Sequence, residues 1–111
     1  MKYSLEHIAE IVGSQSKVDK LPIEHLVLDS RKIYSPATSL FFALKGPRRD
    51  GHHFINDLYK KGVRSFVISE TVQATTYPDA QFIKVKDTLK ALQELAAYHR
   101  SQFNIRVIGI T

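Results

Sequence analysis

Four short apolar runs recur along the chain and predict the strands of one sheet. They are Leu26-Val27-Leu28, Leu40–Leu44, Ser65–Ser69 and Gln81–Val85. The run at 40–44 is apolar at every position, which is typical of a strand covered on both faces. Residues 4–12, 52–61 and 87–103 instead carry apolar side chains three or four positions apart, as helices do. Strands alternating with helices predict an α/β fold, a small mixed sheet flanked by helices.

Composition limits the class of protein. A chain of 111 residues forms one domain with room for a modest core. It contains no cysteine, which excludes a disulfide framework and cysteine catalysis and suits a reducing compartment. No apolar run approaches the roughly 20 residues that span a bilayer, and the N-terminal residues do not form a signal peptide. We therefore expect a cytoplasmic protein without a membrane partner.

The positive charge of the chain is concentrated in one segment. The formal net charge is +5, yet residues 31–64 alone hold eight Lys or Arg against the two acids Asp50 and Asp57. A local basic patch indicates a small anionic ligand or a nucleic-acid contact.

Two loops in this region are candidates for binding. Residues 28–31 follow the first predicted strand, and residues 45–54 lead from the second strand into a helix. In the second loop, Gly46 and Gly51 would let the backbone approach a ligand, and the helix start after Asp50 would direct free N–H groups at an anion. Lys45, Arg48 and Arg49 would add charge that suits a phosphate or diphosphate.

Structural explanations compete with this interpretation. The basic loop can be a solvated connection, with Asp50 a helix cap and Phe54 a core residue. His52 and His53 are adjacent on a helix, where side chains diverge by about 100°. We therefore expect no metal site.

An ordered set of short motifs resembles the N-terminal domain of the Mur ligase family. The family pattern is D-S-R, followed by P-G-x-L-F-x-A-x-x-G-x(3)-D-G-H-x-F. The corresponding segments here are Asp29-Ser30-Arg31, Pro36, Leu40–Gly46, Asp50-Gly51-His52 and Phe54. The set is most similar to the MurF type, which adds D-alanyl-D-alanine to UDP-N-acetylmuramoyl-tripeptide. The alternative is the MurE type, which adds the third amino acid.

The resemblance implies a domain order. Residues 1–85 would bind the UDP substrate, 86–104 would form a connector helix, and 105–111 would be the first strand of an ATP-binding central domain. In this family the terminal Val-Ile-Gly-Ile-Thr runs into a Gly-Ser-x-Gly-Lys-Thr phosphate loop, which does not follow here. We therefore expect an inactive fragment of a cytoplasmic, ATP-dependent ligase of peptidoglycan precursor synthesis. It would hold no catalytic residue and no cofactor, because ATP and magnesium would bind in the central domain.

The resemblance also implies site residues and partners. Leu28 and Ser30 would line the uridine pocket, while residues 46–49 and the helix start would contact uridine and diphosphate. The complete predicted substrate site is Leu28, Ser30, Arg31, Lys45, Gly46, Arg48, Arg49, Asp50, Gly51 and His52. The partners would be a UDP-N-acetylmuramoyl-peptide and, in a monomeric parent enzyme, D-alanyl-D-alanine. A basic nucleic-acid-binding module and a scaffold domain without a ligand remain as alternatives.

The connector helix carries its own expectation. Its predicted apolar side consists of Leu89, Leu92, Leu95, Ala96 and His99. Without the central domain this side would lack part of its cover, so we expect the helix to be mobile or packed on a second copy.

Overall fold

The computed structural model describes residues 3–28, 33, 35–47 and 50–103. The strands are β1 (Tyr3–Ser4), β2 (Pro22–Ile23), β3 (His25–Val27), β4 (Ser39–Phe42), β5 (Ser65–Ile68) and β6 (Gln81–Lys84). The α-helices are α1 (Leu5–Ile11), α2 (Ile55–Lys60) and α3 (Thr88–Phe103), and short 3-10 helices span Pro36–Thr38, Gly51–Phe54 and Ala74–Thr76. Within these ranges, no helix combines the length and the apolar character that crossing a membrane requires.

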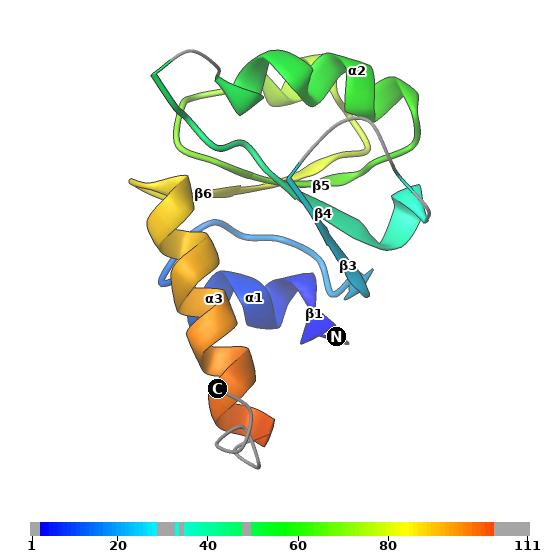
Figure 1. Ribbon diagram of the computed structural model, residues 1–111. Coiled ribbons are helices and arrows are strands. Elements are labelled where there is room, and N and C mark those ends of the chain that lie inside the picture. Colours follow the sequence, from blue (N-terminus) through cyan, green and yellow to red (C-terminus); the bar gives the residue numbers. More distant parts are fainter. Residues whose placement is uncertain (1–2, 29–32, 34, 48–49, 104–111) are drawn as a thin grey trace.

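The main sheet is parallel throughout, with strand order β3-β4-β5-β6 (Figure 1). The predicted α/β fold is confirmed, but the sheet is not mixed. Each pair of neighbouring strands is joined by a long crossover, residues 28–38, 43–64 and 69–80, which returns the chain to the same end of the sheet. The antiparallel pairing lies outside this sheet, between β1 and β2.

Helices cover the two faces of the sheet, with α1 and α3 on one and α2 on the other (Figure 1). Alternate residues of β4 point to opposite faces. Leu40 and Phe42 pack with α1 and α3, whereas Phe41 and Ala43 pack with α2. All four residues of β4 are buried, which confirms the prediction of a strand covered on both faces.

The first two helices begin close to their predicted positions. The Ser4 hydroxyl caps α1 by accepting a hydrogen bond from the N–H of His7 at 3.1 Å. The helix is followed by Gly13, whose φ of 70° favours glycine. The helix predicted at 52–61 instead starts with a 3-10 turn at 51–54, because the N–H of His53 bonds the Asp50 carbonyl three residues back at 3.0 Å.

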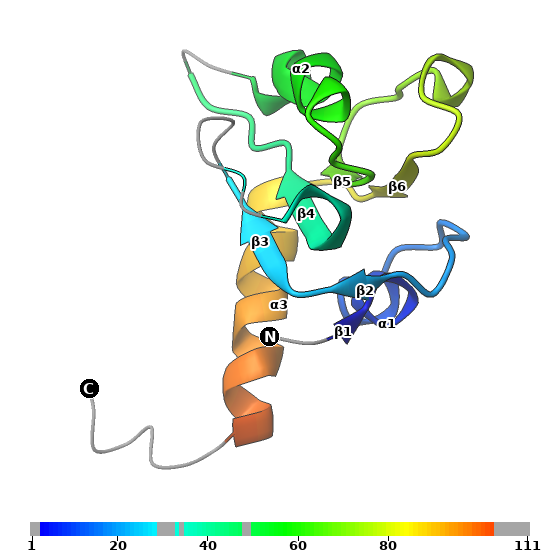
Figure 2. The same ribbon diagram turned by 90° about the vertical axis from the view of Figure 1, so that its right-hand side faces the viewer.

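The helix α3 packs on its own chain through part of its apolar side, so this part needs no second copy as cover; its expected mobility stays a prediction. Ala91 and Leu95 are buried against α1 and the sheet, and the Thr88 hydroxyl donates to the Ala43 carbonyl at 2.9 Å. Figure 2 shows α3 running past the sheet and alongside the N-terminal segment. Leu89 is 51% exposed, so the predicted apolar side was wrong at this position.

A ring cluster joins the later turns of α3 to the N-terminal segment. The Tyr3 hydroxyl and His99 Nδ1 lie 3.0 Å apart, and the Tyr98 hydroxyl and His7 Nε2 lie 3.3 Å apart. These four rings meet edge to face, with centroids 5.5 to 6.1 Å apart. The cluster extends the packing of α3 beyond the sheet.

Candidate functional site

The two candidate loops leave neighbouring strands at the same edge of the sheet. Leu28 follows β3 and is 51% exposed, while Lys45 lies shortly after β4. Ser69 and Glu70 follow β5 at the same edge. In open parallel sheets, ligands bind in the crevice outside the carboxyl ends of the strands. This edge is therefore the candidate site.

The base of the second loop is closed by the chain itself. Lys45 and Asp50 form an isolated antiparallel bridge, and the N–H of Gly51 donates to the Leu44 carbonyl at 2.7 Å. A Cβ at Gly51 would lie 2.8 Å from the Cα of Ala43 and 2.8 Å from the nitrogen of Leu44. The close approach that requires glycine at position 51 is thus made by the β4 backbone.

The helix start after Asp50 does not offer free N–H groups, so that part of the anion argument is wrong. The N–H of His52 donates to the Asp50 carboxylate at 3.0 Å. The N–H groups of Gly51 and His53 donate to the carbonyls of Leu44 and Asp50. The protein's own carboxylate occupies the place where an anion was expected, since Asp50 caps this turn.

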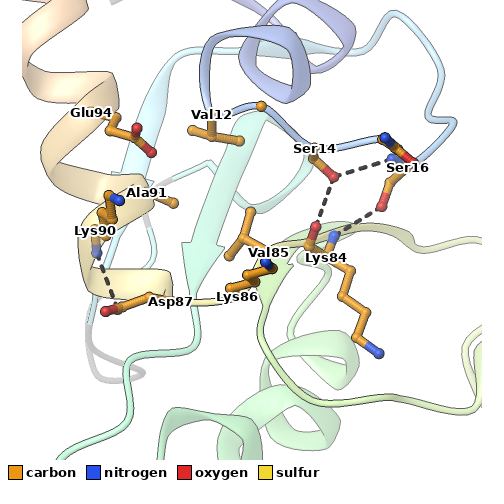
Figure 3. A pocket seen from close by; sticks show the side chains of 12 residues that line it. Val12, Ser14, Ser16, Lys84, Val85, Lys86, Asp87, Lys90, Ala91 and Glu94 are labelled. Carbon is orange, nitrogen blue, oxygen red and sulfur yellow. Dashed lines mark hydrogen bonds between the residues drawn. The ribbon is translucent and has the colours of Figure 1, made fainter.

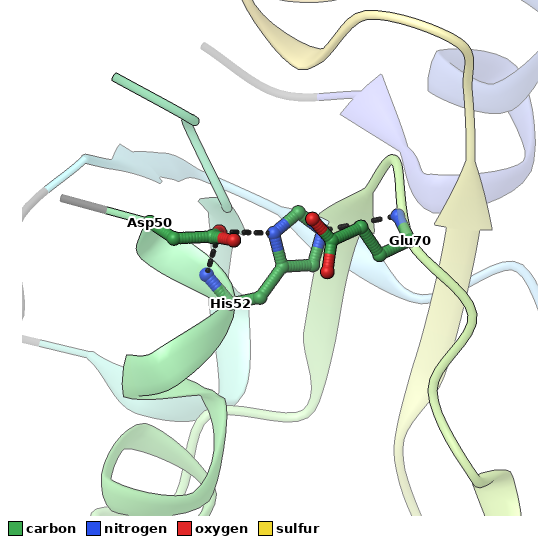
Figure 4. Close-up of side chains that lie close together, drawn as sticks. All are labelled: Asp50, His52 and Glu70. Atoms are coloured by element: carbon green, nitrogen blue, oxygen red, sulfur yellow. Dashed lines mark hydrogen bonds and ion pairs between the residues drawn. The ribbon is translucent and has the colours of Figure 1, made fainter. Parts of the chain in front are cut away.

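The ring of His52 connects the loop to the end of β5 (Figure 4). Its Nδ1 lies 2.5 Å from an Asp50 carboxylate oxygen. Its Nε2 accepts hydrogen bonds from the N–H groups of Ser69 at 3.0 Å and Glu70 at 3.2 Å. With only 8% of the side chain exposed, His52 faces the protein.

Two groups at the loop have shifted pKa values. Burial raises the pKa of the Asp50 carboxyl, but hydrogen bonds from the N–H and the ring of His52, together with the positive charge of Lys45, bring the net pKa below its ordinary value of 3.8. The Glu70 carboxylate lies 2.5 Å from Lys45 Nζ. This hydrogen bond and the opposite charge raise the pKa of Lys45 above 10.5. Both groups are therefore charged at neutral pH.

Asp50, His52 and Glu70 each offer a possible metal ligand, and these atoms lie within 4.8 Å of one another. The existing contacts compete with a metal ion, however. Asp50 bonds the His52 ring, Nε2 accepts two N–H groups, and the Lys45 ammonium lies against Glu70. The cluster is better explained as a set of internal hydrogen bonds and ion pairs.

Several basic residues of the charged segment also have partners within the chain. Lys61 pairs with Asp57 at 3.6 Å, and the Arg64 guanidinium lies 4.1 Å from the Tyr59 ring centroid and bonds the Tyr59 carbonyl. The predicted site residues Ser30, Arg31, Arg48 and Arg49 lie outside the described residues. Their roles stay predictions.

The sequence interpretation did not single out Ser69 and Glu70. Both follow an apolar strand at the carboxyl edge, as Lys45 does, so the same reasoning could have identified them. What the sequence did not indicate is that their N–H groups are bound by a histidine 17 and 18 residues earlier.

A pocket of about 720 Å³ lies at the end of β6, between the loop after α1 and the start of α3 (Figure 3). The hydroxyls of its two serines bond the backbone of β6, the strand at one side of the sheet. Ser14 donates to the Lys84 carbonyl at 2.8 Å, and Ser16 accepts from the Lys84 N–H at 3.0 Å. These bonds satisfy the backbone N–H and carbonyl of Lys84 at the outer edge of β6, so both hydroxyls are engaged within the chain.

Comparisons with known proteins agree on one family. The profile described as "Mur ligase family, catalytic domain" matches residues 22–100. The UDP-N-acetylmuramoyl-tripeptide--D-alanyl-D-alanine ligase of Haemophilus influenzae is 32% identical over 112 residues, covering 100% of this chain and 23% of that protein. The UDP-N-acetylmuramoyl-L-alanyl-D-glutamate--2,6-diaminopimelate ligase of Alkaliphilus metalliredigens is 33% identical over 84% of this chain and 18% of its own length.

The fold has a close counterpart among solved structures. The UDP-N-acetylmuramoylalanyl-D-glutamyl-2,6-diaminopimelate--D-alanyl-D-alanyl ligase from Acinetobacter baumannii matches with a TM-score of 0.79 and 25% identity, covering 92% of this chain and 22% of that one. The chain thus spans about a quarter or less of the length of these three proteins.

Proposed function

Because the chain belongs to the Mur ligase family, we propose that it binds the UDP part of UDP-N-acetylmuramoyl-tripeptide within a MurF-type ligase. Such a ligase would add D-alanyl-D-alanine to a peptidoglycan precursor. The observation that carries the proposal is the match over the whole chain to a ligase named for this substrate. The match to a diaminopimelate ligase supports the MurE type as the alternative.

The arrangement of the sheet edge supports binding of a nucleotide there. Leu28 offers an exposed apolar side chain at the end of β3. Lys45 offers a charged ammonium at the end of β4, beside Gly46, and its side chain is 59% exposed. An apolar side chain and a cation after the ends of two neighbouring strands suit a base and a diphosphate.

The proposed ligase reaction also needs an ATP site. The 111 residues contain no Gly-Lys-Thr or Gly-Lys-Ser phosphate loop, so we assign ATP and magnesium to none of them. In a longer ligase, UDP binding at this edge would anchor the substrate while its carboxylate reacts elsewhere. Because we propose a role in peptidoglycan precursor synthesis, we expect the protein to act in the cytoplasm.

An NMR titration tests the proposal. UDP-N-acetylmuramoyl-tripeptide should shift the amides of Leu28, Lys45 and Gly46, with UDP giving a smaller set and a single-stranded oligonucleotide giving none. The dipeptide form of the substrate separates the two ligase types, because a MurE-type domain should bind it at least as well as the tripeptide. An absence of shifts at millimolar ligand, or shifts only with the oligonucleotide, would reject the proposal.

A matched pair of variants removes one positive charge each. Lys45→Gln should weaken binding of the UDP compound about tenfold, since a charge-assisted contact is lost. Lys60→Gln changes the net charge equally, but on α2, and should leave the affinity unchanged. Equal effects of both substitutions would indicate general electrostatic attraction instead of a site.

A further inference from the structure

The hydrogen bonds of His52 determine where its ring proton lies. Nε2 accepts from the N–H groups of Ser69 and Glu70, so it carries no proton. The proton of the neutral ring is therefore on Nδ1, where it is donated to Asp50 at 2.5 Å. Both ring nitrogens are therefore engaged within the chain, and neither is left to bond a ligand.

Glu70 holds the other end of the same loop. Its carboxylate pairs with Lys45 at 2.5 Å, while its N–H bonds the His52 ring. Lys45 lies at the start of the basic loop, and His52 lies just after its end. The bridge between Lys45 and Asp50 joins the two ends of the loop. The described base of the loop is thus attached to the end of β5 at two points.

We propose that His52 is a positioning residue which, as the neutral Nδ1–H tautomer, fixes Lys45 and Gly46 at the sheet edge for binding the diphosphate of a UDP-sugar. The inference rests on the proposed function, because it takes this edge as the nucleotide site. It differs from the sequence expectation, in which His52 itself contacts the ligand. Loss of the β5 connection should lower affinity even though no ligand contact is removed.

Two amide substitutions separate the two sides of the ring. Asparagine can place its N–H₂ near the Nδ1 position and donate to Asp50, but it does not reach Ser69 and Glu70. Glutamine can place its carbonyl oxygen near the Nε2 position and accept from both N–H groups. The pair therefore compares loss with retention of the β5 connection.

The experiment measures affinity for UDP-N-acetylmuramoyl-tripeptide by calorimetry, with urea unfolding to establish that each protein is folded. His52→Asn should weaken binding about tenfold, and His52→Gln should stay within about threefold of the unchanged chain. Equal affinity in all three proteins would overturn the positioning role and leave the proposed function intact. Equal loss in both variants would overturn it as well, because the β5 connection would then not be the cause.

Two further measurements need no ligand, and the first needs no variant. The ring nitrogen shifts of His52 in the unchanged chain should report the Nδ1–H tautomer at neutral pH; the Nε2–H tautomer would overturn the inference.

If the unchanged chain binds no UDP compound, the proposed function fails. Amide exchange at Lys45 then decides the positioning role: faster exchange in His52→Asn than in His52→Gln supports it, and equal exchange overturns it.

Discussion

Gly51 shows how a single residue can be required by the backbone of its own chain. A methyl group at this position would meet main-chain atoms of Ala43 and Leu44 at 2.8 Å, and main-chain atoms cannot rotate away. Gly51→Ala should therefore lower the free energy of unfolding by about 3 kcal/mol. Gly13→Ala is the matched control, because only its φ of 70° opposes a side chain there, and it should cost about 1 kcal/mol. Urea denaturation measures both; similar costs would contradict the steric argument.

Two buried serines at the starts of β4 and β5 form a natural comparison. Ser39 donates to the Ser35 carbonyl at 2.7 Å, whereas the Ser65 hydroxyl has no hydrogen-bond partner in the described part of the chain. Ser39→Ala should lower the free energy of unfolding by about 1 kcal/mol, because a hydrogen bond is lost. Ser65→Ala should leave it unchanged or raise it by roughly 0.3 kcal/mol. Thermal unfolding of the two variants provides the measurement. A larger loss for Ser65→Ala would mean that its hydroxyl has a partner.

Asp50 should make stability depend on acid. Its pKa is lower in the folded chain than the ordinary 3.8, so its ionised form stabilises the fold above that value, and this contribution is lost as the pH falls toward the folded pKa. Asp50→Asn should therefore reduce the drop in unfolding free energy between about pH 5 and pH 3. Asp79→Asn removes an exposed carboxylate of the same charge and serves as the control. If the unfolding free energy of Asp50→Asn fell over this pH range as much as that of the unchanged chain, the prediction would be refuted.

At the scale of elements, α3 is held by a small number of side chains. Leu95 is fully buried and Leu89 is 51% exposed on the same helix. Leu95→Ala should cost about 2 to 5 kcal/mol, and Leu89→Ala should change stability by no more than about 0.5 kcal/mol. Chemical denaturation with far-ultraviolet detection compares the two. A small effect of Leu95→Ala would support the earlier expectation that this helix lacks cover.

The elements themselves were accessible from sequence, whereas their contacts were not. The apolar run at 40–44 predicted a strand buried on both faces, and the apolar spacing in 4–12 and 87–103 predicted two helices whose observed starts lie within one residue of these bounds. Helical periodicity alone does not determine which residues of a helix face its neighbours. For that reason Leu89 was placed on the packed side of α3, while the buried Ala91 was not.

The same limit applies to the candidate site. The motif Asp50-Gly51-His52 was found from sequence, but its N–H groups were expected to be free. Asp50 itself accepts two of these N–H groups, and the third, from Gly51, is taken by the carbonyl of Leu44, which the bridge at the base of the loop brings to the helix start. Contacts between segments of different strands, such as His52 with Ser69, cannot be deduced from local pattern.

At the scale of the whole molecule, both apolar clusters share β4 and β5, whose side chains alternate between them. Because neither cluster has a strand of its own in the centre of the sheet, we expect the domain to unfold as one unit. Hydrogen exchange should give the slowest amides of α3 and β5 the same opening free energy. An α3 that opens at a clearly lower free energy would show that it is a separate unit.

The ring cluster between α3 and the N-terminal segment has a spectroscopic consequence. The chain contains no tryptophan and five tyrosines. Tyr3 and Tyr98 lie in this cluster on the α1 side, while Tyr59 and Tyr77 meet at 5.0 Å on the α2 side. Near-ultraviolet circular dichroism requires aromatic rings in fixed surroundings. Replacing Tyr98 or Tyr77 by phenylalanine would therefore assign the tyrosine signal to one face of the sheet, giving an optical reporter for each layer without an added label.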